Sequence, residues 1–256
     1  MEKSFKYSND AVSEIVDYSI ILAIILFATG IIIVAGVPIL EDMQDAHHTE
    51  NIKQSFQVLA LNINKVVFGN APTQSVELKM YGGSLSVTGN SQIGITMQTW
   101  NSSSDSFSSS FYGKQMRKIE NDFQDTSTGY ENTGVWIKYS TGEAIMASEP
   151  RFTYANNVLV IPDGSVSGAD SISGSGLVRV TTDAGTRSIN SYQNVSHVNI
   201  SITSDYFKAW EKYLNESMEM QIVDVDAANN TFTASKNYNP NIDVYIVNSA
   251  MDVRID

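Results

Sequence analysis

The sequence predicts an α+β protein in which a long N-terminal hydrophobic α-helix forms a stalk and a β-rich, antiparallel, sandwich-like head follows. Three observations lead to this fold class. An uncharged apolar block lies near the N-terminus, a pattern of helical period follows it directly, and short alternating runs broken by Gly, Asn and Asp fill the rest of the 256 residues. We expect the helical part to cover residues 12–69 and the head to cover residues 70–256.

The apolar block runs from residue 20 to residue 40. It holds 21 residues without a charge, 17 of them hydrophobic, interrupted only by Thr29, Gly30, Gly36 and Pro38. A helix of this length reaches about 31 Å, which is close to the hydrocarbon thickness of a bilayer. A secretory signal peptide is the main alternative, but its apolar region usually has about 7–15 residues. We therefore predict a retained membrane-spanning helix.

The charges on either side of the block predict its orientation. Lys3 and Lys6 precede the block, whereas Glu41, Asp42 and Asp45 follow it. Because basic residues accumulate on the cytoplasmic side of a membrane helix, we expect a cytoplasmic N-terminus and an external head.

An amphipathic pattern continues beyond the block. Apolar residues recur at steps of three and four, at Ile52, Phe56, Leu59, Ala60, Ile63, Val66 and Val67. Gly69 stands where a C-terminal cap is expected, and Pro38 is expected to bend the helix rather than end it. A single helix from residue 12 to residue 68 would span roughly 85 Å. Its apolar stripe could pack on its own head, on copies of itself, or on both.

Short alternating runs after Pro72 predict the β-strands of the head. The pair Gly82-Gly83 separates two of them and predicts a hairpin turn. The serine-rich residues 101–110 predict a flexible loop, and helices are expected at 113–123 and at 204–214, the second capped by Ser204. Further strands are expected at 93–100, 134–139, 157–161, 176–182, 195–201, 218–225, 231–235 and 243–247.

Composition excludes several function classes. The chain has 28 acidic and 16 basic residues, a formal net charge of −12, and no cysteine. The acidic balance disfavours nucleic acid as a partner, and the lack of cysteine excludes disulfides, thiol catalysis and Cys-ligated metals. His47 and His48 point about 100° apart on a helix and His197 is alone, so no metal site is predicted. We find no catalytic motif and expect neither an enzyme nor a cofactor.

Five Asn-x-Ser/Thr sequences follow the apolar block, at Asn101, Asn194, Asn199, Asn215 and Asn229. Such sequences accept N-linked glycans in exported proteins. Two interpretations stay open, because a chain rich in Ser, Thr and Asn also produces them by chance. The head is either glycosylated or carries these asparagines unmodified at its surface.

The N-terminus carries a family resemblance. The run Asp10-Ala11-Val12-Ser13-Glu14-Ile15-Val16-Asp17, placed directly before the apolar block, resembles the class III signal peptide of archaeal type IV pilins. The downstream order of helix and β-rich head, with residues 130–135, 148–154 and 171–176, is similar to archaeal pilin-like surface proteins. One departure is that Asn9-Asp10 stand where the family usually has Lys or Arg.

The resemblance implies a processing and assembly pathway. Residues 1–11 would be a leader, removed by a prepilin peptidase after Asp10 or Ala11, so that the mature chain begins at Ala11 or Val12. Glu14, with Asp17 second, would pair with the terminal amine of a neighbouring subunit; alternatively, both stay solvated among lipid headgroups. The filament core would be formed by the apolar helix, represented by Ile20, Ile24, Phe27, Ile32 and Pro38.

Together these observations predict a structural subunit of an archaeal extracellular type IV pilus-like filament, with a surface adhesion or appendage role. The expected partners are copies of the chain in a helical filament, the membrane before assembly, and the pilus assembly machinery. The alternative is a single-pass membrane-anchored ectodomain that binds a ligand or partner at the cell surface.

Overall fold

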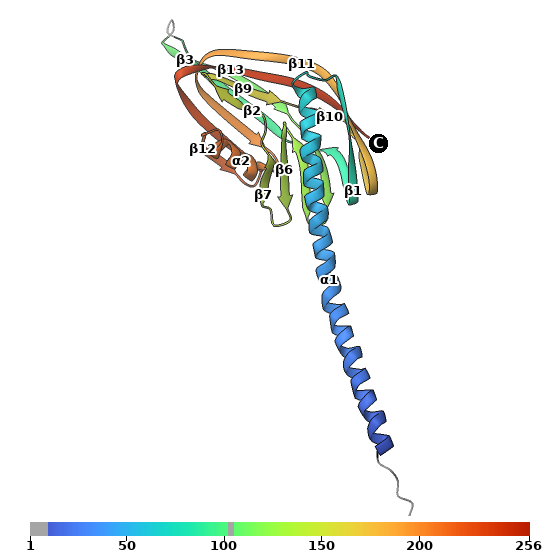
Figure 1. Ribbon diagram of the computed structural model, residues 1–256. Helices are drawn as coiled ribbons and strands as arrows, with labels where there is room; N and C mark the ends of the chain where they lie inside the picture. Colours follow the sequence, from blue (N-terminus) through green and yellow to red (C-terminus); the bar gives the residue numbers. More distant parts are fainter. Residues whose placement is uncertain (1–9, 102–104) are drawn as a thin grey trace, which may run out of the picture. The chain divides into compact units, whose positions relative to one another are not determined.

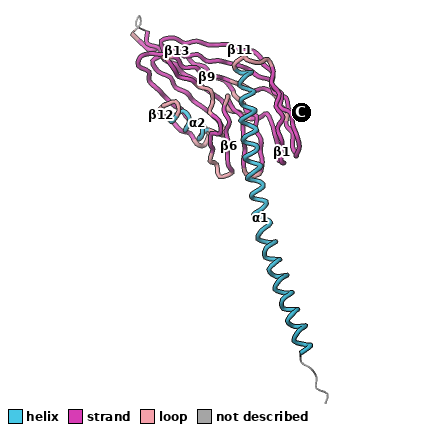
Figure 2. Tube along the Cα trace, in the orientation of Figure 1, coloured by secondary structure: helices cyan, strands magenta, loops and turns pink. Residues whose placement is uncertain are grey.

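The computed structural model describes residues 10–101 and 105–256, and the chain divides into two compact units between His48 and Thr49 (Figures 1 and 2). The elements are α1 (Asp10–Val67), β1 (Thr73–Thr88), β2 (Gln92–Asn101), β3 (Ser106–Gln115), β4 (Lys118–Phe123), β5 (Thr126–Glu131), β6 (Gly134–Tyr139), β7 (Ala144–Ser148), β8 (Thr153–Ala155), β9 (Val158–Asp163), β10 (Val166–Ser167), β11 (Ser171–Thr203), α2 (Phe207–Glu216), β12 (Gln221–Asp226) and β13 (Thr231–Ile255).

The predicted N-terminal helix is confirmed as α1. The helix continues through Pro38 and ends at Val67, as its apolar periodicity predicts. Gly69 has a φ of +74°, and its N–H donates to the carbonyl of Val66 at 3.0 Å. A β-carbon at Gly69 would lie 1.8 Å from Arg187 Nη1, so both the backbone conformation and the close approach favour glycine at this cap.

Within the described residues the strands form one sheet of 13 strands. Its main path runs β7-β6-β5-β4-β1-β11-β13-β9-β8, while β10 and β12 pair with β13, and β2 joins β11 to β3. Most pairs are antiparallel, but β9 and β10 each run parallel to β13. The α+β class is confirmed, and the head is a curled, mixed half-barrel rather than a purely antiparallel sandwich.

The curl arises in the two longest strands. β11 has 33 residues and β13 has 25, and they pair antiparallel over most of their length (Figure 1). Their register shifts between Ala184 and Arg187 and again between Tyr192 and Val195. Such irregularities bend a strand and increase its twist, so one half of β11 pairs with β1 and the other half with β2.

Two apolar cores lie in the unit from Thr49 onward. In the first, the whole predicted stripe of α1 is buried against side chains that include Leu78, Leu85 and Ile119. The stripe therefore packs on its own head. Packing on the head is one of the three arrangements that the sequence leaves open, beside packing on copies of the chain and packing on both. Each buried Leu- or Ile-sized side chain contributes roughly 1.5–3 kcal/mol, so this half of α1 is part of the head's core.

The second core packs α2 against β2, β9 and the far halves of β11 and β13. The helix predicted at 204–214 is confirmed as α2, but Tyr206, not Ser204, is its N-cap residue. Ser204 Oγ instead accepts the N–H of Tyr206 at 3.0 Å and donates to Glu131. The Ser204 hydroxyl therefore donates its hydrogen bond to a buried carboxyl group, while its oxygen accepts from the backbone.

Three local predictions are wrong. Gly82 and Gly83 do not form a hairpin turn but a bulge inside β1, where a β-carbon at Gly83 would meet the carbonyl of Asp122 at 2.0 Å. The helix expected at 113–123 is the end of β3 and all of β4, since Ile119 and Phe123 alternate with polar residues along a buried strand. The loop expected at 101–110 contains the start of β3 from Ser106, and residues 102–104 lie outside the described chain.

Candidate assembly surface

The apolar half of α1 is uncovered. Ile20, Ile24, Phe27 and Ile32 expose 52 to 73% of their surface, and none of the most apolar stretch of the helix is buried inside the described chain. Among the described residues, α1 is the one helix long and apolar enough to cross a membrane. An apolar surface of this size needs a bilayer or a protein partner, as in a membrane anchor or a signal segment.

Polar side chains inside this segment are satisfied by the helix itself. Ser19 Oγ donates to the carbonyl of Ile15 at 2.8 Å, and Thr29 Oγ1 donates to the carbonyl of Ile25 at 2.7 Å. A β-carbon at Gly30 or Gly36 would meet nothing within 4 Å. Because these hydroxyls need no external partner, the segment can enter a hydrocarbon environment at little polar cost.

The acidic residues expected to act in assembly lie at the edge of the described chain. Asp17 is exposed on α1. Asp10, Ala11, Val12 and Glu14 belong to the described helix, but their side chains lie outside the described residues. Most of the leader expected at 1–11 also lies outside them, so its cleavage and the role of Glu14 stay predictions.

A polar contact holds the far half of α1 on the sheet. Asn64, 8% exposed, donates from Nδ2 to the carbonyl of Thr133 at 3.1 Å and accepts the Tyr130 hydroxyl at 3.1 Å. Asn132 and Thr133 turn the chain between β5 and β6 with φ of +42° and +70°. The side chain of Asn132 accepts the N–H of Gly164, and that of Thr133 accepts the N–H of Arg151. This turn therefore ties α1 to two loops of the head.

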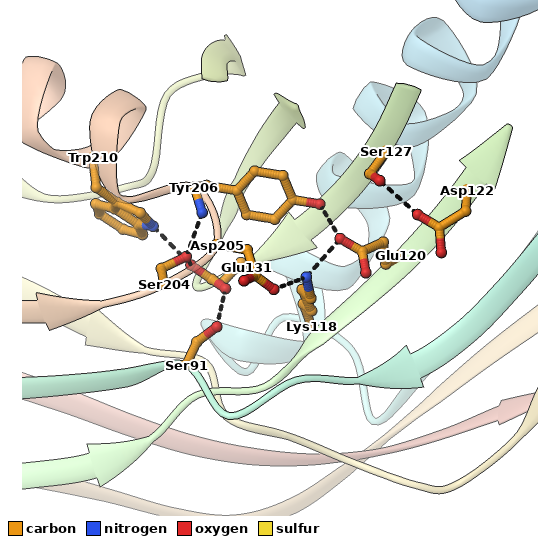
Figure 3. A network of polar contacts seen from close by, with 10 residues as sticks. All are labelled: Ser91, Lys118, Glu120, Asp122, Ser127, Glu131, Ser204, Asp205, Tyr206 and Trp210. Carbon is orange, nitrogen blue, oxygen red and sulfur yellow. Dashed lines mark hydrogen bonds and ion pairs between the residues drawn. The ribbon is translucent and has the colours of Figure 1, made fainter. Parts of the chain in front are cut away.

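Glu131, next to that turn, forms the centre of a buried hydrogen-bond cluster (Figure 3). Its Oε1 accepts Ser204 Oγ at 2.7 Å and Trp210 Nε1 at 2.8 Å, and its Oε2 accepts a short hydrogen bond from Ser91. Burial raises the pKa of Glu131, although the three donors act in the opposite direction. The cluster joins β5, the β1–β2 connection and α2, which are far apart in sequence.

Lys118 lies beside this cluster and is 3% exposed (Figure 3). Its Nζ donates to Glu120 Oε1 at 2.6 Å and to Asp205 Oδ2 at 2.7 Å, and Tyr206 also donates to Glu120 at 2.6 Å. Burial favours a lower pKa for Lys118, but the two carboxylates outweigh it and raise that pKa. Lys118 is therefore held as an ammonium between two carboxylates, which is a structural arrangement.

Sequence reasoning missed this cluster. Residues 130–135 entered only as part of a family resemblance, and Glu131 was expected neither to be buried nor to bind other side chains. A signal was present, because Asn-Thr-Gly between two apolar strands is typical of a hairpin turn with positive φ. The partners Ser91, Ser204 and Trp210 lie 40 to 79 residues away, and no local pattern identifies them.

The pH dependence of folding should report the buried carboxyl of Glu131. Because its folded pKa is raised, the folded state binds this proton more tightly, and stability falls as pH rises from the ordinary carboxyl pKa toward the raised one. Glu131→Gln keeps the shape of the side chain but cannot titrate. Between the two pKa values its free energy of unfolding should therefore rise relative to that of the wild type by up to about 1.4 kcal/mol per pH unit. Denaturant unfolding from pH 4 upward measures the difference.

The exposed Glu143→Gln is the control, and its stability curve should follow the wild type. Parallel curves for Glu131→Gln and the wild type would show that Glu131 has no raised pKa in the folded protein.

The predicted glycosylation asparagines lie in different environments. Asn194, Asn215 and Asn229 are exposed, whereas Asn199 is half-buried within β11, where both neighbouring strands pair with it. The side chain of Asn101 lies outside the described residues. At Asn215 and Asn229 the Nδ2 atom, which would carry a glycan, donates to the carbonyl of Met220 and to Asp226 Oδ2.

The predicted absence of a metal site concerns His47, His48 and His197. In the part of the chain that the structure describes, no group of three or more His, Asp or Glu side chains could hold a metal ion. His197 Nδ1 shares a hydrogen bond of 2.6 Å with Asn237 Oδ1 across the β11–β13 ladder.

Comparison with known proteins supports the architecture more than a function. A protein of Archaeoglobus fulgidus described as uncharacterized is 35% identical over 77 residues, which are 30% of this chain and 25% of that protein. No solved structure matches the chain. A family model described as a family of unknown function, DUF7289, matches residues 11–254. A long apolar N-terminal helix followed by a β-rich domain is a pilin-like architecture, and the chain that carries it here belongs to the DUF7289 family.

Proposed function

We propose that this chain is a structural subunit of an archaeal extracellular type IV pilus-like filament, assembled through the apolar half of α1. One observation carries the proposal: the stripe from Ile52 to Val67 is buried in the chain's own head, whereas none of the described residues buries the apolar segment before it. The segment therefore needs an external partner. A bilayer serves this purpose before assembly, and the helices of other copies serve it afterwards.

The driving force of such assembly is burial of apolar area. Fourteen Leu, Ile, Val or Phe side chains lie between residues 20 and 40, and each contributes roughly 1.5–3 kcal/mol when fully buried. No chemical turnover is involved. The acidic, Ser- and Asn-rich head forms the outer surface, with glycans at its exposed sequons and a role as an adhesive or structural appendage.

Electron microscopy of sheared cell-surface material tests the proposal. We expect filaments that contain this chain, with an N-terminus at Ala11 or Val12 by mass spectrometry. The chain would then have lost a short leader to a prepilin peptidase before assembly. A full-length chain found only in detergent-extracted membranes would instead support the membrane-anchored ectodomain and contradict the filament.

The role proposed for Glu14 has its own test. Glu14→Ala should leave membrane insertion unchanged but reduce filament yield roughly tenfold, the factor that corresponds to about 1.4 kcal/mol of lost contact energy. Glu41→Ala, which removes an exposed carboxylate on the other side of the apolar segment, is the matched control and should assemble normally. Normal filament yield from Glu14→Ala would remove Glu14 from the assembly mechanism.

A further inference from the structure

Lys114, Asn248 and Asp163 come together from three strands of the head. Lys114 lies near the end of β3, and its Nζ donates to Asn248 Oδ1 on β13 at 2.7 Å. Asn248 pairs in the parallel β13–β9 ladder with Asp163, so the two side chains lie side by side on one face of the sheet. Lys114 Nζ is 4.0 Å from Asp163 Oδ2. A primary amine, a carboxamide and a carboxyl group thus share one small site.

The carboxyl group in this site is suited to hold and pass on a proton. Asp163 is fully buried, the Tyr112 hydroxyl donates to its Oδ2, and its Oδ1 has no hydrogen-bond partner among the described residues. Burial raises the pKa of Asp163, while the Tyr112 hydrogen bond and the charge of Lys114 act in the opposite direction. The free Oδ1 is therefore available to an incoming or leaving proton.

The carboxamide is held in place on its other side. Asn248 Nδ2 donates to Ser188 Oγ at 3.3 Å, and Ser188 is the β11 partner of Asn248 in the antiparallel ladder. With Nδ2 turned toward Ser188, the carbonyl oxygen faces Lys114. The amine and the carboxamide are thus held next to each other, and such proximity raises the effective concentration of two reacting groups.

Two other lysines show what is particular to Lys114. Lys118 lies between two carboxylates that keep its amine protonated and without a free electron pair. Lys65 donates to the carboxamide of Asn62 at 2.9 Å, but that pair is exposed on α1. Only at Lys114 do the described contacts combine an amine, a carboxamide and a buried carboxyl group.

We propose that Lys114 and Asn248 condense into an intramolecular amide cross-link, with Asp163 as the acid–base group. Asp163 first takes a proton from the Lys114 ammonium, which lies 4.0 Å from its Oδ2. The resulting amine attacks Cγ of Asn248, and the Asp163 proton moves to Oδ1 as the new Nζ–Cγ bond forms. Asp163 then takes a proton from Nζ and passes it to Nδ2. The Cγ–Nδ2 bond breaks, ammonia leaves, and the Oδ1 proton returns to Asp163 as the carbonyl reforms. No oxidant or second substrate is consumed.

The cross-link would join residues 134 positions apart. β3 pairs with β2 alone among the described strands, so its attachment to the sheet depends on that single ladder. A covalent bond to β13 would fasten this edge strand to the opposite side of the curled sheet. It would stabilise the head whether the chain acts as a filament subunit or as a membrane-anchored ectodomain.

Mass spectrometry of the purified full-length protein tests the proposal directly. A cross-linked chain is lighter by about 17 Da, the mass of one ammonia. Trypsin cannot cut after an acylated Lys114, so residues 80–117 should appear joined to residues 237–254 as one branched peptide. Recovery of peptides 80–114 and 237–254 as separate, unmodified species from the folded protein would overturn the proposal.

Three variants distinguish loss of the cross-linking reaction from a general loss of folding. Lys114→Arg keeps a donor for Asn248 but cannot form this bond, so the branched peptide should vanish and the melting temperature should fall. Asp163→Asn should lower the cross-linked fraction at least about tenfold, because acid–base catalysis is lost. Lys65→Arg is the control and should leave the branched peptide unchanged. A full yield of branched peptide in Asp163→Asn would remove Asp163 from the reaction.

Discussion

Replacing Ile24 with aspartate is expected to weaken both membrane insertion and filament assembly. Ile24 lies within the apolar segment and exposes 62% of its surface, so the substitution disturbs no contact within the described chain. A carboxylate at the centre of a membrane helix costs about 2.5–3.5 kcal/mol on insertion scales, and a carboxylate buried without a partner between packed apolar helices is also unfavourable. Membrane fractionation and electron microscopy of sheared material measure the two effects, and Ile32→Asp should behave in the same way.

Leu177→Asp provides the matched control. Leu177 is 72% exposed in β11, so the same added carboxylate there should leave insertion unchanged. Normal insertion together with a normal filament yield from Ile24→Asp would contradict both roles assigned to residues 20–40. Normal insertion with loss of filaments would show that the added carboxylate disturbs only the packing between helices.

The largest loss of folding stability is expected from Trp210→Ala. Trp210 is fully buried, and its ring lies 4.3 Å from that of Trp136 and 5.8 Å from that of Phe152, measured between centroids. Removing a buried tryptophan costs about 3–5 kcal/mol, and the loss of its N–H leaves buried Glu131 with one donor fewer. Denaturant unfolding should show the decrease in the free energy of unfolding.

Trp210→Phe separates these two contributions, because it keeps most of the ring and loses only the donor to Glu131. We expect it to cost about 1–3 kcal/mol. Trp100→Ala, at a tryptophan that is 40% exposed, should cost clearly less than Trp210→Ala. Similar losses at Trp100 and Trp210 would argue against a core organised around Trp210.

The sequence predicts well those elements in which apolar side chains recur at a regular spacing. The stripe from Ile52 to Val67 specifies a helix with one buried face, and the glycine at Gly69 specifies where it ends. The apolar block is long and uncharged enough to predict a membrane segment, and its side chains are exposed in the described chain. Helix α2 follows from its aromatic face, since Phe207, Trp210 and Leu214 recur at helical spacing.

The predictions of local structure fail where contacts between distant parts of the chain determine the conformation. Ser106–Gln115 is rich in serine, but Phe107 and Phe111 occupy alternate positions, and pairing with β2 makes it a strand. Gly82-Gly83 has the composition of a turn, yet the neighbouring strand continues past it and converts it into a bulge. The clusters around Glu131 and Asp163 could not be predicted, because the curl of β11 and β13 brings their partners together.

The burial of the far half of α1 determines where the chain can be cut. A fragment that begins at Thr49 keeps the seven apolar side chains of α1 that pack in the first core, and it loses the exposed apolar segment. A fragment that begins at residue 70 would open that core to water along β1 and β4. Proteolytic shaving of cells should therefore release a stable soluble product with an N-terminus close to residue 49, and recombinant work on the head should start from the same boundary.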